Sequence, residues 1–332
     1  MKRLLFTCLY VLLCCATALA AKDTKSGRSL FDAWEEKPEL NLELHVNFDS
    51  IEAHRRSVDF FPATFVENGR ELALEVAIRG RFRRTNCAMP PLKLKFKKAG
   101  LRANGLNTHN DFKLVTHCTD DAAGQDALRR EQLAYELYNT VNPAASFRTQ
   151  LLTITYVNTV DGSTTTSLAI LIEDTDELKN RLDAKNCQDC YGYTKDQIAN
   201  AEQLALFQYM IGNVDYTTNT VRNLKLMQID GGENVFVPYD FDYSGLVNAN
   251  YARPQVALGQ QRITDRVMVW DYAEAADFTA AADHFLGLKD TLLAQVDATD
   301  LDAGSKREVT KYLKGFFRDL KSGNLQAPAA KK

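Results

Sequence analysis

The spacing of apolar residues changes along this chain, from a period of two in the first part to a period near 3.6 further on. Leu40 to Val46, Glu71 to Arg79 and Leu92 to Phe96 alternate apolar and polar residues, which predicts half-buried strands. Asn68-Gly69 is typical of a tight hairpin turn. Further strands are predicted at 61–66, 111–116, 149–158 and 164–172.

Helical spacing begins at Gln125 and continues to Val141, where Asn142-Pro143 predicts the end of the helix. Further helices are predicted at 176–183, 195–211, 275–297 and 302–321, and two short strands at 223–229 and 234–239. This order of elements predicts an α+β protein of two lobes with a crevice between them. The strand-rich N-terminal lobe would cover residues 39–172, and the mainly helical C-terminal lobe residues 173–323.

The N-terminus has the three parts of a cleavable signal peptide over residues 1–20. Lys2 and Arg3 precede a short apolar run, and Ala18-Leu19-Ala20 fits a cleavage site. A lipid-modified Cys14 or Cys15 is the second interpretation, because Leu12-Leu13 lacks the small residue expected before a lipidated cysteine. We therefore expect an exported protein, periplasmic or extracellular, with no transmembrane segment in the mature chain.

The ends of the mature chain lack apolar periodicity. Residues 21–38 are predicted to be a linker and residues 324–332 a flexible tail. The whole chain carries 40 Lys and Arg against 43 Asp and Glu, a net charge of −3, and loss of the two positive charges of the leader lowers this to −5. That balance argues against a nucleic-acid partner.

Four of the seven cysteines follow the leader, and an even number in an exported protein predicts disulfides. Three pairings of four cysteines are possible. We favour Cys87–Cys118 with Cys187–Cys190. A zinc site is a poorer interpretation, because the chain has a single Cys-x-x-Cys and no pair of histidines at ligand spacing.

Acidic and amide residues gather around the predicted strands at 223–239. Asp215 follows an apolar helix, Asn223 opens one strand, and Asp240 and Asp242 follow the next. A hairpin would bring Asn223 and Asp240 together, and carboxylate and amide oxygens suit Mg²⁺, Mn²⁺ or Ca²⁺. The order of these groups fits metal-dependent phosphoryl transfer, in which a carboxylate orients the acceptor hydroxyl and an Asn and an Asp hold the metal.

The segments GNVDY (212–216), RNLKL (222–226) and VPYDFDYSG (237–245) resemble the kinase-like family of spore coat protein H and, more remotely, the protein-kinase superfamily. The resemblance covers roughly residues 75–250. It implies a two-lobed protein-kinase-like fold that binds ATP with Mg²⁺ or Mn²⁺. Asp215 would be the catalytic aspartate, Asn223 and Asp240 the metal ligands, and Asp242 an auxiliary ligand.

The same resemblance implies a phosphate-binding lysine held by a glutamate. Lys113 is the first candidate, with Glu131 or Glu136 on the following helix. Arg79-Gly80-Arg81 and the Pro91–Lys95 segment resemble the RG…K region of the family, which makes Lys93 and Lys95 rivals and Arg79 a possible anion ligand.

Two departures from the protein-kinase pattern are visible. Eight positions separate Asp215 from Asn223, where protein kinases have five, and Asn219 is a competing match. No glycine-rich loop precedes the lysine candidates.

Three functional hypotheses follow. The first is an exported phosphotransferase that moves a phosphoryl group from ATP to a hydroxyl-bearing protein or small molecule. The alternative is a catalytically inactive kinase-like module that binds partners at the envelope or surface. The third is a metal-dependent hydrolase that uses Asp240, Asp242 and Glu173. The chain lacks Gly-x-Ser-x-Gly and closely spaced histidines, which argues against a serine triad or a zinc hydrolase.

Overall fold

A computed structural model describes residues 25–36, 41–187, 191–229, 232–323 and 325. The predicted signal peptide and all but one residue of the predicted tail lie outside these ranges, so both stay predictions. In the described ranges, no helix combines the length and the apolar character needed to cross a bilayer.

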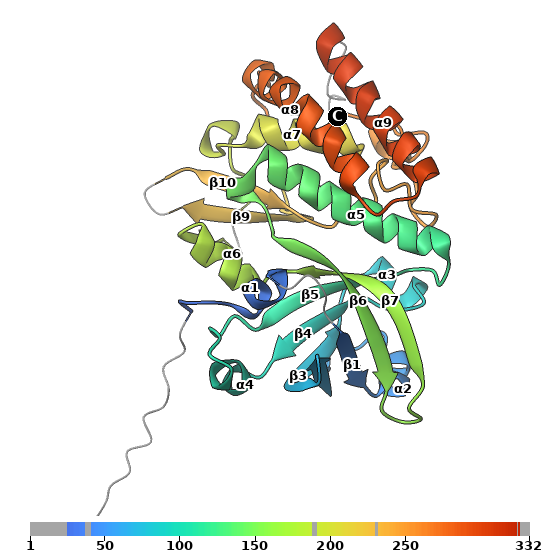
Figure 1. The fold of residues 1–332 in the computed structure, drawn as a ribbon. Coiled ribbons are helices and arrows are strands. Elements are labelled where there is room, and N and C mark those ends of the chain that lie inside the picture. Colours follow the sequence, from blue (N-terminus) through green and yellow to red (C-terminus); the bar gives the residue numbers. More distant parts are fainter. Residues whose placement is uncertain (1–24, 37–40, 188–190, 230–231, 324, 326–332) are drawn as a thin grey trace, which may run out of the picture.

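Seven strands from the first half of the chain close into a barrel (Figure 1). They are β1 (Leu42–Val46), β2 (Phe60–Glu67), β3 (Arg70–Ile78), β4 (Leu92–Phe96), β5 (Asp111–Thr116), β6 (Thr149–Asn158) and β7 (Thr164–Ile172). Their order around the barrel is β1-β2-β3-β4-β5-β7-β6. All neighbours are antiparallel except β1 and β6, which pair in parallel with Leu42 opposite Ile154 and so close the ring.

The prediction of a two-lobed protein-kinase-like fold is wrong. The strands expected to form an N-terminal lobe instead make a closed mixed barrel, because β1 pairs with both β2 and β6 and leaves no open edge in the ring. Strand periodicity shows which residues face a core, but it does not show which distant strand pairs with which. The pairing of Leu42 with Ile154 therefore could not be predicted from the sequence pattern.

Aromatic side chains fill the inside of the barrel. The Trp34 ring stacks on Phe65 with centroids 5.1 Å apart and also contacts Phe96 and Phe112. Trp34 belongs to α1 (Leu30–Glu35), which begins at a Ser29 capping box. This helix lies within the predicted linker, and its six residues are too few to show a helical period in the sequence.

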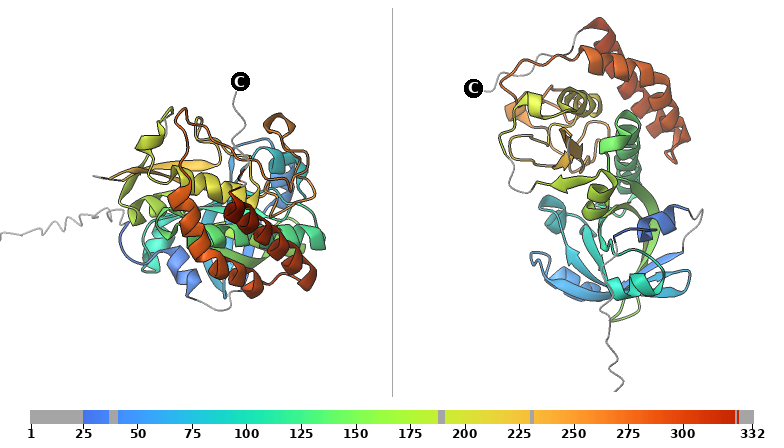
Figure 2. Two further views of the ribbon diagram at one scale, coloured as in Figure 1. Left: turned by 90° about the horizontal axis from the view of Figure 1, so that it is seen from above. Right: turned by 90° about the vertical axis from the view of Figure 1, so that its left-hand side faces the viewer.

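Helix α5 and the described residues that follow β7 form a second, mainly helical layer on one end of the barrel (Figures 1 and 2). Its long helices are α5 (Ala122–Val141), α7 (Ala201–Ile211), α8 (Thr279–Ala298) and α9 (Ala303–Ser322). A three-stranded sheet joins them, made of β8 (Ala184–Asn186), β9 (Leu224–Ile229) and β10 (Asn234–Pro238). Helix α5 contacts β6, β7 and α8, so it connects the barrel to the helices.

Short helices occupy the connections. They are α2 (Phe48–Ala53), α3 (Phe82–Asn86), α4 (Lys98–Ala103), α6 (Thr175–Arg181), and the 3₁₀ turns η1 (Pro143–Ala145), η2 (Lys195–Gln197) and η3 (Val256–Leu258). The strands predicted at 92–96, 111–116, 149–158 and 164–172 are confirmed with the same bounds. The single helix predicted over 195–211 is wrong in its first turns, where η2 precedes a separate start of α7 at Ala201.

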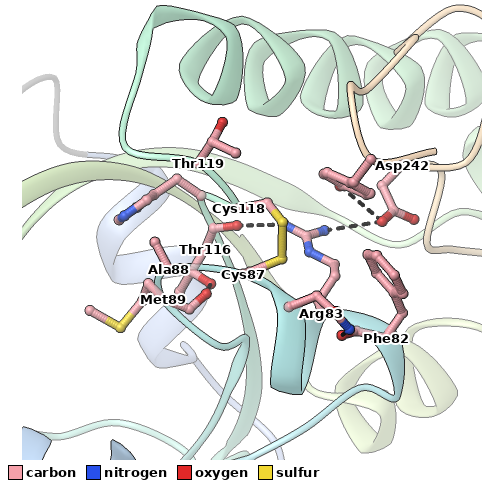
Figure 3. Close-up of a disulfide and its surroundings, with 12 residues drawn as sticks. Phe82, Arg83, Cys87, Ala88, Met89, Thr116, Cys118, Thr119 and Asp242 are labelled. Atoms are coloured by element: carbon pink, nitrogen blue, oxygen red, sulfur yellow. Dashed lines mark hydrogen bonds and ion pairs between the residues drawn. A yellow bond between two sulfur atoms is a disulfide. The ribbon is translucent and has the colours of Figure 1, made fainter.

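The disulfide Cys87–Cys118 is confirmed. It joins the end of α3 to the segment just after β5, 31 residues later in the chain (Figure 3). Closing a loop of that length restricts the unfolded chain and so stabilises the fold. The second predicted pair includes Cys190, which lies outside the described residues, and it stays a prediction.

Candidate functional site

The β9–β10 hairpin and the end of α7 bring three of the predicted site residues together. Asn223 lies directly before β9 and Asp240 two residues after β10, and the Tyr239 backbone N–H donates to the Asn223 carbonyl at 3.1 Å. The Asn223 side-chain amide donates to Asp215, at 2.6 Å to its backbone oxygen and 3.1 Å to Oδ2. Asn223 therefore contacts the predicted catalytic aspartate, whereas Asn219, the competing match for the metal-binding asparagine, is exposed.

The backbone is bent sharply at both ends of this hairpin. Asn223 has φ +54° and Asp240 has φ +67°, in the left-handed region that side chains other than glycine seldom adopt. The Asp240 N–H donates to the Tyr135 hydroxyl oxygen at 2.9 Å. Such conformations cost free energy and recur at sites that must present a particular group.

Three carboxylates lie close enough to affect one another. Burial raises the pKa of Asp215, Arg222 lowers it, and Asp240 raises it further. Arg222 Nη2 is 3.4 Å from Asp215 Oδ1. Burial raises the pKa of Asp242 to about 7, and Asp240 adds to that rise. The cluster is therefore rich in negative charge that protein cations only partly neutralise.

The donor set suits a hard divalent cation that also binds substrate oxygens. Within the described ranges, no group of three or more His, Cys, Asp or Glu residues is arranged to hold a metal ion alone. Mg²⁺ in phosphate-transfer sites is held by one or two carboxylates and completes its shell with water and phosphate. The Asn223 side-chain amide N–H donates to Asp215. Its amide oxygen is therefore the Asn223 atom that remains to bind a cation together with Asp240.

A buried arginine holds Asp242 in place. Arg83 of α3 lies 3.7 Å from Asp242 Oδ2 and 3.3 Å from Glu131 Oε2, and it also donates to the Thr116 carbonyl (Figure 3). The Tyr251 hydroxyl donates to the same Asp242 oxygen at 3.0 Å. One guanidinium is thus the ion-pair partner of two buried carboxyl groups, Glu131 and Asp242.

Glu131 does not hold Lys113 as expected. Its partner is Arg83, while Lys113 Nζ donates to Thr175 Oγ1 at 2.9 Å. Burial raises the pKa of Glu131 to about 8, Arg83 opposes the rise, and Asp242 and Asp240 add to it. No sequence pattern indicates that Arg83, in a short helix, pairs with Glu131 in the place predicted for Lys113.

Three of the predicted nucleotide-binding residues, Lys113, Arg79 and Lys93, line one cavity of about 430 Å³. Its lining residues are Arg79, Lys93, Asn110, Asp111, Lys113, Asp174, Thr175, Asp176, Lys179 and Lys225. We call it the cationic pocket. Lys93 pairs with Asp111 at 2.7 Å, and the rival Lys95 is exposed and contacts the Phe60 ring instead.

Lys113 lies at the buried wall of the cationic pocket, 4.9 Å from the Phe147 ring centre. Burial lowers its pKa to about 7, and Arg79 and Lys225 lower it further. Lys225 is not among the residues predicted from the sequence, although the alternation of RNLKL places it on the face opposite Leu224 and Leu226. Excess positive charge at this wall favours an anionic ligand.

The cationic pocket and the acidic cluster adjoin at two tyrosines. Burial raises the pKa of both Tyr135 and Tyr239, Asp240 adds to the rise, and Arg79 opposes it. Lys225, which lines the pocket, also lies over the Tyr239 ring at 5.7 Å from its centre. Tyr239 therefore lies between a lining residue of the pocket and Asp240 of the cluster.

The arrangement of Glu173 does not fit the hydrolase hypothesis, which combined it with Asp240 and Asp242. Glu173 is fully buried and is bound by Arg148 at 3.0 Å and Arg181 at 2.7 Å. Both carboxylate oxygens are thus occupied by arginines, which makes Glu173 a structural anchor at the end of β7.

No known family model matches this chain, and no curated protein sequence matches it. The resemblance to the spore coat protein H family stays a prediction from sequence motifs.

Replacing Arg83 should destabilise the fold in a pH-dependent way. Arg83→Met leaves Glu131 and Asp242 buried without their cation, and we expect a loss of about 3–5 kcal/mol in the free energy of unfolding at pH 8. The pKa values of Glu131 and Asp242 are raised in the folded protein, to about 8 and about 7, so both groups lose stabilisation as pH rises from their unfolded pKa values through these folded ones. At pH 5 both carboxyl groups are mostly protonated, so the loss of stability caused by Arg83→Met should be smaller there than at pH 8. Urea unfolding at the two pH values measures this.

Arg84→Met is the matched control, because Arg84 donates to the carbonyls of Arg56 and Ile78 and not to a carboxylate. Its effect should not change with pH. An equal loss for Arg83→Met at both pH values would contradict the shared-cation account.

Proposed function

We propose that this protein is an exported phosphotransferase that moves the γ-phosphoryl group of ATP to a hydroxyl of a protein or small-molecule acceptor, with Mg²⁺ or Mn²⁺ as cofactor. The observation that carries the proposal is geometric: Lys225, which lines the cationic pocket, lies over the ring of Tyr239, the residue directly before Asp240. The predicted leader supports export to the periplasm or the outside.

The cationic pocket supplies the phosphate-binding groups. Lys113, Arg79 and Lys225 repel one another, which is part of why the Lys113 pKa is lowered. A polyphosphate would remove that repulsion and restore the full charge of Lys113. The volume of about 430 Å³ lies in the usual range of small-molecule sites.

Asn223 and Asp240 would hold the divalent cation, with Asp242 as an auxiliary ligand whose Oδ2 already binds Tyr251 and Arg83. The cation would neutralise charge on the transferred phosphate. The left-handed backbone at Asn223 and Asp240 fixes both side chains at one end of the hairpin before any ligand arrives.

Asp215 would act on the acceptor hydroxyl. Its raised pKa makes it a better proton acceptor than an ordinary aspartate, and the Asn223 amide holds one of its oxygens. In the proposed step, a bond forms between the acceptor oxygen and the γ-phosphorus, the bond to the ADP oxygen breaks, and the hydroxyl proton passes to Asp215. The products are ADP and the phosphorylated acceptor.

The motif resemblance points to the same roles for Asp215, Asn223 and Asp240. Because the fold that it implied is wrong, the proposal rests on the side-chain arrangement. A second candidate, nucleotide binding without turnover, is favoured by one observation: Arg83 engages both Glu131 and Asp242. That engagement leaves Lys113 without the carboxylate partner typical of active phosphotransferases of the kinase type.

Nucleotide binding should depend on Lys113 but not on Lys95. We expect Lys113→Met to weaken binding of a fluorescent ATP analogue roughly tenfold or more, since a charge-assisted contact inside the pocket is lost. Lys95→Met is the matched control on the neighbouring strand, where the side chain is exposed. Fluorescence titration with Mg²⁺ measures both, and equal affinities for the two variants would argue against this pocket as the phosphate site.

Turnover should separate the roles of Asp215 and Asp240. Asp215→Asn should lower phosphoryl transfer or ATP hydrolysis by roughly 100-fold while nucleotide affinity stays unchanged, because only proton transfer is affected. Asp240→Asn should weaken metal-dependent binding and abolish turnover. Radiolabelled ATP provides the readout, and tight Mg²⁺-dependent binding by the unmodified protein with no turnover would favour the second candidate.

A further inference from the structure

Helix α9 carries a row of positive side chains on its outer face. Arg307, Lys311, Lys314, Arg318 and Lys321 follow one another at spacings of four, three, four and three residues, which places them on one side of the helix. All five are exposed. The opposite side of α9 is buried in the core through Val309, Leu313, Phe316, Phe317 and Leu320. We call the five cations the α9 basic stripe.

The basic stripe is not neutralised by its own protein. None of the five cations forms an ion pair with another described residue, although Arg307 lies near the Asp302 cap. Helix α9 carries two acids: Glu308 is paired with Arg130 at 2.5 Å, and Asp319 follows Arg318 in the sequence. Burial lowers the pKa of Arg266, while Tyr312, Tyr209 and Asp319 oppose that fall and Arg318 adds to it slightly.

Two cavities meet at the basic stripe, because Lys311 and Arg318 line both of them. One of about 400 Å³ adds Arg130, Arg262 and Arg266, with Glu308. The other of about 420 Å³ adds Lys306, Arg307 and Lys314, with Asp297 of α8. Both therefore carry an excess of positive charge and have room for small anionic groups.

The stripe extends roughly 21 Å along α9, from the helical rise of about 1.5 Å per residue. The Cβ atoms of neighbouring cations stand roughly 5–6 Å apart, which is less than the Debye length of about 8 Å at physiological salt, so the positive charges repel one another in the free protein. Helix α9 lies at the end of the molecule opposite the barrel (Figures 1 and 2). The sequence after α9 also contains two lysines, Lys331 and Lys332.

We propose that the α9 basic stripe is a docking surface for anionic phospholipid bilayers. A flat array of phosphate headgroups complements a row of cations on an exposed helix, and such basic helices bind anionic membranes. Because the apolar side of α9 is already buried, the contact is electrostatic and peripheral, without insertion of the helix. The docked protein would keep its barrel turned away from the bilayer. This inference does not depend on the proposed phosphotransfer.

The test is co-sedimentation of the mature full-length protein with phosphatidylcholine vesicles that contain either no anionic lipid or one-third phosphatidylglycerol. The protein should bind only the anionic vesicles, and added salt should release it. Lys311→Glu with Lys314→Glu should weaken binding roughly tenfold or more. Arg56→Glu with Lys95→Glu is the control, since it changes net charge by the same amount at exposed positions near the barrel.

Circular dichroism verifies that both double variants are folded. Three results would overturn the proposal: no binding to anionic vesicles, equal losses for the stripe and the control variants, or binding that salt does not reverse. Stripe-dependent binding of polyglutamate at lower concentrations than the vesicles require would reassign the surface to an acidic protein and would also overturn it.

Discussion

The buried guanidinium of Arg83 is the interaction on which the arrangement of the candidate site depends. It reaches Thr116 at the end of β5, Glu131 in α5 and Asp242 after β10, and so it ties the barrel to both sides of the helical layer. The Cys87–Cys118 disulfide fixes α3, which carries Arg83, to the same end of β5. Burying one cation between two carboxylates costs desolvation, and only the complete set of partners offsets that cost.

Two local features then give the site its shape. The left-handed conformations of Asn223 and Asp240 turn the ends of the β9–β10 hairpin toward Asp215 and Tyr135. The cationic pocket forms where β3, β4 and β5 meet α6 and β9. It brings lysine and arginine side chains of the barrel close to those of the helical layer. The acidic cluster thus lies next to the cationic pocket. In phosphoryl transfer, carboxylates hold the metal and cations hold the phosphates, so the proposed metal–nucleotide complex would need both groups.

Much of the local structure could be predicted from the sequence: period-two alternation predicted the strand at 92–96, and the other strands predicted at 111–116, 149–158 and 164–172 also have the observed bounds. The closure of the barrel could not, since nothing local to Leu42 indicates that it faces Ile154. The same limit applies to the site. The nearness of Asn223 to Asp240 follows from one hairpin, whereas the pairing of Glu131 with Arg83 depends on how distant elements pack.

The central claim is that the cationic pocket and the acidic cluster bind one and the same ligand. A double-mutant cycle on Lys113→Met and Asp240→Asn, read as affinity for a nonhydrolysable ATP analogue with and without Mn²⁺, tests it most directly. The account predicts a coupling energy of about 1 kcal/mol or more that appears only with Mn²⁺. Losses that simply add, with the metal as without it, would contradict the account.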